Sequence, residues 1–248
     1  MDETLARQVA ALCQDLHARA WVANHDGNVS VRLGDGRFLA SPTAVSKRDV
    51  RPESLVVVDG EGKVVQGTRR VFSEMALHLA AYRARPDVSW VVHAHPPHAT
   101  AWAVAGESFW DAPFLAEAVV SLGDSVPLVS YAMPGSSTAA LEAAISRADA
   151  VLLGNHGVLT VGPDAETALL RMELVEHLAR IAALARPLGG ARPLPAEDVA
   201  KLLDARRKAG LGPEGRANAG LTGAGTPPLA PPTTDVEALV RDALRRLG

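Results

Sequence analysis

The spacing of apolar residues along the chain alternates between the periods of short strands and of amphipathic helices. Apolar positions three and four apart predict helices over residues 4–20, 74–83, 97–105, 137–147 and 163–184. Short apolar runs predict strands over residues 29–33, 37–40, 55–58, 63–65, 88–95, 150–153 and 158–161, with a further segment of unassigned type around residues 126–131. Two glycine-rich turns, at residues 34–36 and 59–62, join pairs of these strands into hairpins. Hairpins interleaved with helices predict an α/β layered domain.

Two histidines stand at the end of one of these strands. His93 and His95 follow a strongly apolar run, and Pro96 and Pro97 prevent the strand from continuing. Residues two apart on a strand share a face, so both imidazoles can point at one place. His156 follows another apolar run and precedes a glycine, so it also lies where a strand becomes a turn. Three imidazoles with an open fourth position are typical of a catalytic zinc-type site.

A plainer interpretation applies to any lone histidine near a strand end, which is most often a hydrogen-bonded polar side chain. The pairing of His93 with His95 makes this interpretation less fitting here. The other histidines have no partner at ligand spacing, and we interpret them as surface, core or supporting residues: His17, His25, His78, His98 and His177.

Composition narrows the class of protein. The formal net charge is −3, with no basic stripe that would indicate nucleic acid as a partner. The single Cys13 excludes an internal disulfide and fits a reducing cytoplasm. The sequence shows no signal peptide at Met1, no apolar run long enough to cross a membrane, and no GxGxxG or GxxxxGK motif. We therefore expect a cytoplasmic protein of α/β type that is not a nucleotide-binding fold.

The last quarter of the 248-residue chain has a different character. Residues 195–208 predict one more helix. Residues 212–234 contain five glycines and five prolines, which predict a linker. Residues 235–248 place their apolar side chains on one face of a short helix that would be marginal alone. We expect a domain over 1–211, a linker over 212–234 and an amphipathic helix over 235–248, a frayed tail being the alternative.

Five separated motifs, in their order and spacing, resemble the class II aldolase/adducin family: Gly27-Asn28-Val29-Ser30, Ser41-Pro42-Thr43, Ser73-Glu74, His93-Ala94-His95 and Asn155-His156-Gly157. The resemblance covers roughly residues 1–210. It implies an α/β/α fold around a mostly antiparallel sheet, a divalent metal that is usually zinc, and a homotetramer. It also implies that His93, His95 and His156 are the metal ligands and that Glu74 is the acid/base carboxylate.

The chemistry of an aldol cleavage agrees with these roles. Cleavage of a ketose phosphate leaves an enediolate, whose negative charge a metal stabilises as a Lewis acid. A neighbouring carboxylate can move the proton to or from the carbon. Without the resemblance, Glu74 could equally be a first-turn carboxylate that interacts with a helix dipole.

The resemblance further implies that Gly27, Asn28, Thr43 and Ser73 hold the phosphate or oxygens of the substrate. For Gly27 and Asn28 an ordinary turn before a strand is the alternative. Where the family pattern has a glycine, this chain has Ala44, and where the pattern has a second hydroxyl residue, this chain has Phe72. Both positions belong to the phosphate pocket of the family, so these departures argue against phosphate binding. It also has proton-donating tyrosines where this chain has Ala116 and, in the C-terminal segment, Ala209. Three residues are candidates to replace them: His25, Lys47 and Glu117.

The C-terminal segment has its own resemblance. A Gly/Pro-rich linker followed by residues 235–241 is similar to the encapsulation peptides that direct enzymes into bacterial microcompartments. This resemblance implies a shell protein as a partner. The motif is short, and many amphipathic helices share its pattern.

Three functions fit the sequence. The first is a lyase that cleaves a ketose 1-phosphate of the L-fuculose 1-phosphate type to dihydroxyacetone phosphate and a short aldehyde such as lactaldehyde. The second keeps the fold and the metal but decarboxylates a keto-acid phosphate or cleaves an unphosphorylated substrate. The third is a non-catalytic, adducin-like interaction domain, which the complete set of histidines and Glu74 makes the weakest. Epimerase relatives carry Asp at the position of Glu74, which disfavours epimerisation.

Overall fold

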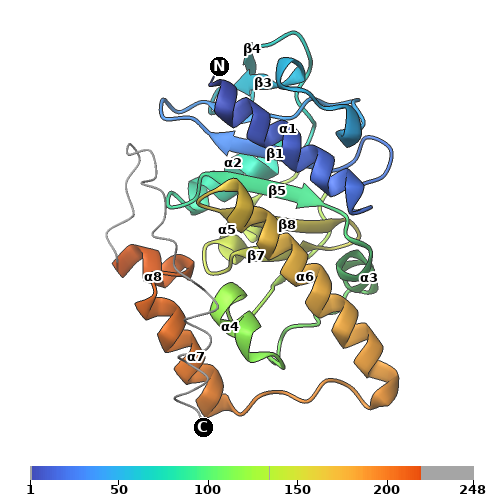
Figure 1. Cartoon of the computed structure of the whole chain (residues 1–248), viewed down its shortest axis with the longest axis vertical. Coiled ribbons are helices and arrows are strands. Elements are labelled where there is room, and N and C mark those ends of the chain that lie inside the picture. The colour runs from blue at the N-terminus through green and yellow to red at the C-terminus, as the bar shows by residue number, and fades with distance from the viewer. Residues whose placement is uncertain (1, 134, 219–248) are drawn as a thin grey trace.

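The computed structural model describes residues 2–133 and 135–218. Its centre is one mixed sheet with the strand order β4-β3-β2-β1-β5-β8-β7-β6 (Figure 1). The strands are β1 (Asn28–Arg32), β2 (Phe38–Ala40), β3 (Val56–Val58), β4 (Val64–Gln66), β5 (Trp90–Ala94), β6 (Leu128–Val129), β7 (Ala150–Leu153) and β8 (Gly157–Gly162). All neighbouring strands are antiparallel except β6 and β7, which are parallel.

Helices lie on both faces of this sheet. The helices are α1 (Glu3–Ala18), α2 (Met75–Ala84), α3 (Pro97–Ala105), α4 (Ala116–Leu122), α5 (Ala139–Ile145), α6 (Ala165–Ala185), α7 (Ala196–Lys208) and α8 (Gly212–Asn218). Three short 3-10 turns complete the set: η1 (Lys47–Asp49), η2 (Pro52–Ser54) and η3 (Arg186–Leu188). Helices α1 and α6 cover one face, and α2 and α5 cover the other (Figure 1). The expected α/β/α fold around a mostly antiparallel sheet is confirmed.

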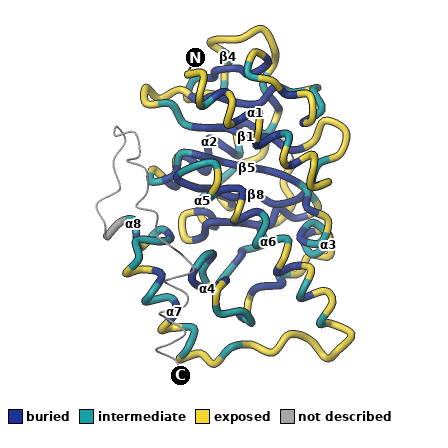
Figure 2. Tube along the Cα trace, in the orientation of Figure 1, coloured by how far each residue is buried: buried dark blue, intermediate teal, exposed yellow. Residues whose placement is uncertain are grey.

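Two apolar cores lie on the two sides of the sheet. Val29 and Val92 point to the core beneath α1 and α6, whereas Val91 and Val151 point to the core beneath α2 and α5. This division follows from the alternation of side chains along each strand. The central strands are buried throughout and the loops at the rim are exposed (Figure 2).

The chain supplies local signals for where these elements begin and end. Asp2 caps α1 by accepting hydrogen bonds from the backbone of Thr4 and Leu5. Pro97 stands in the first turn of α3, where a missing N–H costs nothing. Gly106 then ends α3 in the left-handed conformation.

The C-terminal part of the described chain differs from the sequence-based expectation. Residues 212–218, the start of the predicted linker, form helix α8. The first residue of this helix, Gly212, lies against the guanidinium of Arg206. A Cβ on Gly212 would lie only 2.7 Å from Nε of Arg206, so a larger residue would not fit there without a shift. Arg216 of α8 donates a hydrogen bond to the carbonyl of Asp87 at 3.4 Å. The rest of the predicted linker and the predicted helix over 235–248 lie outside the described residues. Within the described part of the chain, every helix is too short or too polar to span a bilayer.

A buried ion cluster joins this C-terminal part to the sheet. Asp149, directly before β7, is fully buried and binds three arginines. Arg85 lies 3.0 Å and Arg171 2.8 Å from its carboxylate oxygens, and Arg206 of α7 contacts it as well. Burial raises the pKa of Asp149, but the three positive charges outweigh it and hold the pKa low, at about 2. The cluster therefore ties α2, α6 and α7 to one anion.

Candidate metal centre

The sheet brings the three predicted ligands together at one edge. His93 is the fourth residue of β5, and His95 follows the end of that strand. His156 lies in the turn between β7 and β8, and β8 is paired with β5 so that Val158 is opposite Ala94. This register places the turn beside the end of β5. Residues far apart in sequence thus meet because three antiparallel strands end at the same place.

The histidine side chains converge on one point. Nε2 of His95 lies 3.1 Å from Nε2 of His93, and one ring nitrogen from each of the three histidines lies within 4.8 Å of the others. Two imidazole nitrogens bound tetrahedrally to zinc at about 2.0–2.1 Å stand about 3.3 Å apart. The donor set and its spacing therefore fit a divalent metal.

The other ring nitrogens orient the imidazoles. Nδ1 of His93 lies 2.9 Å from the carbonyl oxygen of Val158, so Nδ1 carries the hydrogen and Nε2 keeps its lone pair. Nδ1 of His95 lies 3.8 Å from Oδ2 of Asp26. Carbonyl or carboxylate partners of this kind are usual behind metal-binding histidines.

Burial keeps these imidazoles uncharged. Desolvation is the largest cause that lowers the pKa of His93, to about 3; the Glu74 carboxylate opposes this lowering, and the neighbouring His95 and His156 add to it. Desolvation also lowers the pKa of His95. A neutral imidazole is the form that binds a metal, so both rings are ready to act as ligands at neutral pH.

Glu74 points into the same cluster. It precedes α2, but among the described residues its carboxylate makes no capping bond to that helix. Instead Oε1 lies 2.7 Å from Nε2 of His156, and Oε2 lies 3.6 Å from Nε2 of His93. Oε2 also accepts a hydrogen bond of 2.6 Å from Nδ2 of Asn28. The carboxylate is therefore engaged with the site rather than with a helix dipole.

The surroundings of Glu74 favour its ionised form. Burial alone raises the pKa of this carboxyl group, but the hydrogen bond with His156, the proximity of His93 and the hydrogen bond from Asn28 lower the pKa well below its ordinary range. Glu74 is thus a carboxylate at neutral pH. In this form the carboxylate can accept a proton or bind a positively charged ligand.

The predicted substrate residues lie at the start of β1 and in two further loops. Gly27 adopts a positive φ of 71°, and a Cβ there would collide with Val22 and approach the carbonyl of His93 at 3.2 Å. An isolated bridge between Pro42 and Val71 sets the loop of Thr43 beside the loop of Ser73. Thr43 is half-buried and Ser73 is exposed.

The amide of Asn28 is engaged on both sides. Its Nδ2 donates to Glu74, and its Oδ1 lies 2.6 Å from Nε2 of His78. Asn28 is also opposite His93 in the pairing of β1 with β5. Its position is set by the metal centre, and a role in substrate binding stays a prediction.

The two departures from the family pattern have visible consequences. Ala44 adopts a positive φ of 56°, a conformation that glycine adopts at less cost. Phe72 is buried, and its ring centroid lies 4.9 Å from that of His78. Phe72 therefore belongs to the packing behind Glu74 rather than to an open loop.

The three candidates for proton delivery differ in their environment. Lys47 is buried, and its Nζ donates to the carbonyl oxygens of His25 and Val45 at 2.9 and 3.3 Å. This amine holds a loop in place and faces away from bulk water. His25 and Glu117 are exposed.

Two residues that the sequence did not single out take part in the site. Asp26 faces His95, and its place directly before Gly27 and Asn28 was an available signal. His78 contacts Asn28 from α2. It stands four residues after Glu74, one helical turn away, which would have suggested a shared face.

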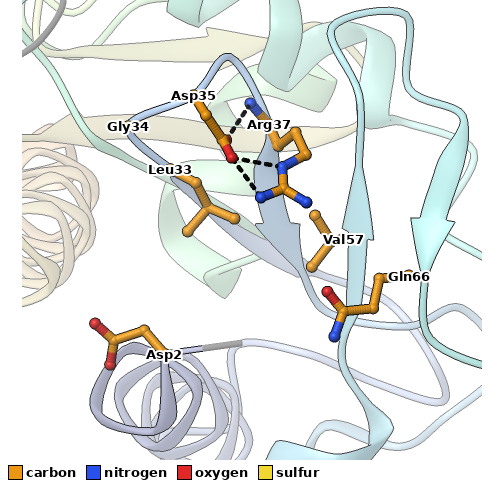
Figure 3. Close-up of a pocket in the computed structure, with 7 residues that line it drawn as sticks. All are labelled: Asp2, Leu33, Gly34, Asp35, Arg37, Val57 and Gln66. Atoms are coloured by element: carbon orange, nitrogen blue, oxygen red, sulfur yellow. Dashed lines mark hydrogen bonds and ion pairs between the residues drawn. The ribbon is translucent and has the colours of Figure 1, made fainter.

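A separate cavity of about 320 Å³ lies at the other end of β1 (Figure 3). It is lined by Asp2, Leu33, Gly34, Asp35, Arg37, Val57 and Gln66. Asp35 and Arg37 pair with each other across the hairpin turn. The histidine cluster is at the opposite end of this strand, so the cavity is not part of the site.

Comparisons with known proteins agree with this geometry. Residues 7–183 match the family described as Class II Aldolase and Adducin N-terminal domain. The chain is 31% identical over 180 residues to 5-deoxy-D-ribulose 1-phosphate aldolase of Bacillus thuringiensis, covering 71% of this chain and 83% of that protein. It is 33% identical over 179 residues to L-fuculose phosphate aldolase of Escherichia coli, covering 71% and 81%.

Two further matches cover a larger share of this chain. The chain is 31% identical over 209 residues to 3-oxo-tetronate 4-phosphate decarboxylase of Escherichia coli, covering 82% of this chain and 96% of that protein. Among solved structures, L-fuculose 1-phosphate aldolase superposes with a TM-score of 0.75 at 26% identity, covering 82% and 96%.

Proposed function

This chain belongs to the class II aldolase and adducin family, whose enzymes are carbon–carbon lyases that depend on a divalent metal, and from that premise we propose its reaction. It cleaves a ketose 1-phosphate of the L-fuculose 1-phosphate type to dihydroxyacetone phosphate and a short aldehyde such as lactaldehyde. The observation that carries the proposal is the convergence of three histidine nitrogens and the Glu74 carboxylate on one point.

Each of these residues has a role in the proposal. His93, His95 and His156 hold the metal, and zinc is the metal that three imidazoles and an open position suit best. When bound, the metal stabilises negative charge on the substrate oxygens. Glu74 carries the proton that must reach the substrate carbon after the carbon–carbon bond breaks, or leave it in the reverse direction. Its contact with His156 supports this role, because the carboxylate lies beside a proposed metal ligand.

The two loops beside the cluster support a phosphate group on the substrate. The backbone N–H of Thr43 donates to the carbonyl of Arg70 at 3.0 Å, so Thr43 lies beside the loop that carries Ser73. Arg69 and Arg70 are exposed in that loop and add positive charge next to the hydroxyl groups. Phosphate binds favourably to hydroxyl and guanidinium donors.

A second candidate reaction is the decarboxylation of a keto-acid phosphate. The match to 3-oxo-tetronate 4-phosphate decarboxylase favours it, because it covers 82% of this chain. Loss of carbon dioxide also leaves an enediolate that must be protonated on carbon. The same metal and the same carboxylate therefore fit both reactions. Cleavage of an unphosphorylated substrate is a third variant, for which Ala44 and Phe72 argue.

One comparison of substrates separates these reactions. The metal-loaded enzyme is assayed for dihydroxyacetone phosphate release from L-fuculose 1-phosphate and for carbon dioxide release from 3-oxo-tetronate 4-phosphate. We expect kcat/KM for the ketose phosphate to exceed that for the keto-acid phosphate at least tenfold. The reverse order would replace the aldolase with a decarboxylase, and turnover of unphosphorylated L-fuculose at an equal rate would remove the phosphate from the proposal.

We propose further that the enzyme is a homotetramer. Leu170, Leu184 and Leu188 are more than half exposed on or just after α6, with Leu188 reaching 85%. We propose that a partner subunit covers these side chains. Light scattering of the purified enzyme tests the assembly, and a mass of 26.0 kDa would contradict it.

The chain beyond residue 218 lies outside the described residues, and its role is a proposal from sequence. Residues 235–248 act as an encapsulation peptide for a bacterial microcompartment, joined by the remainder of the predicted linker. A fluorescent protein fused to residues 219–248 should form puncta in cells that make the shell. Diffuse fluorescence in those cells would contradict the proposal.

A further inference from the structure

A row of buried hydrogen bonds leads from Tyr82 to the carboxylate of Glu74. The Oη of Tyr82 lies 2.9 Å from Oγ of Ser30, which lies 2.7 Å from Nδ1 of His78. Nε2 of His78 lies 2.6 Å from Oδ1 of Asn28, and Nδ2 of Asn28 lies 2.6 Å from Oε2 of Glu74. The row thus connects α2 back to itself through two residues of β1.

The chemistry of the groups determines the direction of the bonds between Ser30 and Glu74. The ionised carboxylate of Glu74 only accepts, so Asn28 must present its NH2 group to it. The carbonyl oxygen of Asn28 then faces His78, whose Nε2 must carry a hydrogen. Nδ1 of His78 is therefore the acceptor for the hydroxyl of Ser30. The hydroxyl of Tyr82 lies beside the oxygen of Ser30 and also donates to the carbonyl of Ser89 at 3.2 Å. The three donors between Ser30 and Glu74 all point toward Glu74.

Burial makes this arrangement strict. His78 and Ser30 are fully buried, and Tyr82 and Asn28 are 2% and 3% exposed. A donor or acceptor left without a partner in such a place costs about 1–3 kcal/mol. Desolvation, reinforced by the nearby His93, lowers the pKa of His78 to about 3, which agrees with a neutral ring that has one N–H. If His78 carried its hydrogen on Nδ1 instead, Nε2 would need a donor and the Asn28 amide would have to flip. The amide oxygen of Asn28 would then face the carboxylate of Glu74.

We propose that His78 is a positioning residue of the lyase: its Nε2–H fixes the orientation of the Asn28 amide, and the amide in turn holds the Glu74 carboxylate against the metal centre. The inference rests on the proposed role of Glu74. The row is not a proton wire, because the Asn28 amide carries hydrogens on nitrogen that it does not exchange readily for those of His78. Its function is to leave Glu74 a single orientation, with Oε1 toward His156.

Substitution of His78 tests this role. His78→Met keeps the bulk and removes both ring nitrogens, whereas His78→Gln keeps an N–H donor for Asn28. We expect His78→Met to lower kcat about 10- to 100-fold with KM and metal content within twofold of wild type, as loss of an aligned proton carrier should. The loss of log kcat in His78→Gln should be at most half of the loss in His78→Met. Equal losses in both variants would contradict the proposal.

A double-mutant cycle separates positioning from general stability. Because Asn28→Ala already lacks the amide that His78 orients, adding His78→Met to Asn28→Ala should change kcat less than twofold. Additive losses would show that His78 acts by another route. Thr160→Val is a matched control, because it removes a buried hydroxyl that donates to the carbonyl of Ala168 in α6 at 2.9 Å and is not part of the row. It should lower Tm and leave kcat unchanged.

A measurement on the wild-type enzyme needs no substrate. In zinc-loaded protein labelled with 15N-histidine, the ring nitrogens of His78 are identified by their absence from the spectrum of His78→Gln. We expect the neutral tautomer with hydrogen on Nε2. Hydrogen on Nδ1, or on both nitrogens at pH 7, would overturn the proposal. If L-fuculose 1-phosphate is not cleaved, the proposed reaction fails while this result still decides the role of His78.

Discussion

A Cβ atom on Gly157 would lie 2.5 Å from Cδ2 of His95, so only hydrogen fits between the start of β8 and this imidazole. It would also lie 2.6 Å from the carbonyl oxygen of Ala94. Neither contact can be relieved by a flexible side chain, because one atom is in a ring and the other is in a central strand. The glycine after His156 is thus required by the position of His95.

Gly157→Ala should therefore move the His95 ring and weaken metal binding. We expect an affinity loss of about 10- to 100-fold, the range seen when groups behind metal ligands are changed. Competition with a chromogenic zinc chelator measures it. Gly34→Ala is the matched control, because no atom lies within 4 Å of its added Cβ. Equal zinc affinity in the two variants would contradict this account of the glycine.

Glu74→Gln should separate metal binding from turnover. The amide keeps the shape of the side chain but cannot carry the proton, so kcat should fall by about 10²- to 10⁴-fold. The three histidines are unchanged, so metal content should stay at the wild-type value. Steady-state kinetics and elemental analysis of the same sample give both quantities. An unchanged kcat would remove Glu74 from the mechanism.

Asp149→Asn should destabilise the protein without touching the site. The substitution leaves Arg85, Arg171 and Arg206 buried around a neutral amide. Breaking a buried ion pair costs about 3–5 kcal/mol, which corresponds to a Tm lower by about 10 °C for a chain of this size. Asp35→Asn, in an exposed pair with Arg37, should leave Tm unchanged. Similar decreases of Tm in both variants would show that the buried cluster around Asp149 does not stabilise the fold more than an exposed ion pair does.

Stability of the metal-free protein should fall as the pH drops below neutrality. His78 has a pKa of about 3 in the fold against about 6.5 in the unfolded chain, so between these values only the unfolded chain binds the proton. The free energy of unfolding then decreases by about 1.4 kcal/mol per pH unit for such a group, and His93 adds to it. Carboxylates do not contribute above pH 5, where they are ionised in both states.

Urea denaturation at pH 7.5 and 5.0 measures this dependence. His78→Gln removes one of these groups, so its stability should fall less over the same interval. A wild-type protein whose unfolding free energy is equal at the two pH values would contradict the prediction.

The strong periodic segments of the sequence were sufficient to predict most of the fold. The apolar run before Gly154 became β7, and Pro96 and Pro97 marked the boundary between β5 and α3. Helix α4 was not predicted, because its seven residues are preceded by Leu115, which offers no side-chain cap. Helix α8 was predicted as linker, since Gly212 and Gly215 disfavour a helix locally. Its contacts with Arg206 and Asp87 are long-range and leave no local signal.

The candidate site was predictable to the extent that its residues form short motifs. His93 and His95 have a spacing that suggests a shared target, whereas His156 joins them only through the pairing of β5 with β8. His78 had no partner at ligand spacing, and its role depends on a contact with Asn28 fifty residues away. Such contacts follow from strand register and helix placement, which periodicity alone does not determine.

The central claim is that three histidines hold a divalent metal on which the lyase activity depends. We would measure the zinc content and the dihydroxyacetone phosphate release of the wild-type enzyme and of His95→Ala, each before and after treatment with a chelator. The account predicts about one zinc per chain with activity that is lost with the chelator and restored by zinc, and loss of both in His95→Ala. A wild-type enzyme that binds no divalent metal, or that cleaves its substrate at full rate without one, would contradict it.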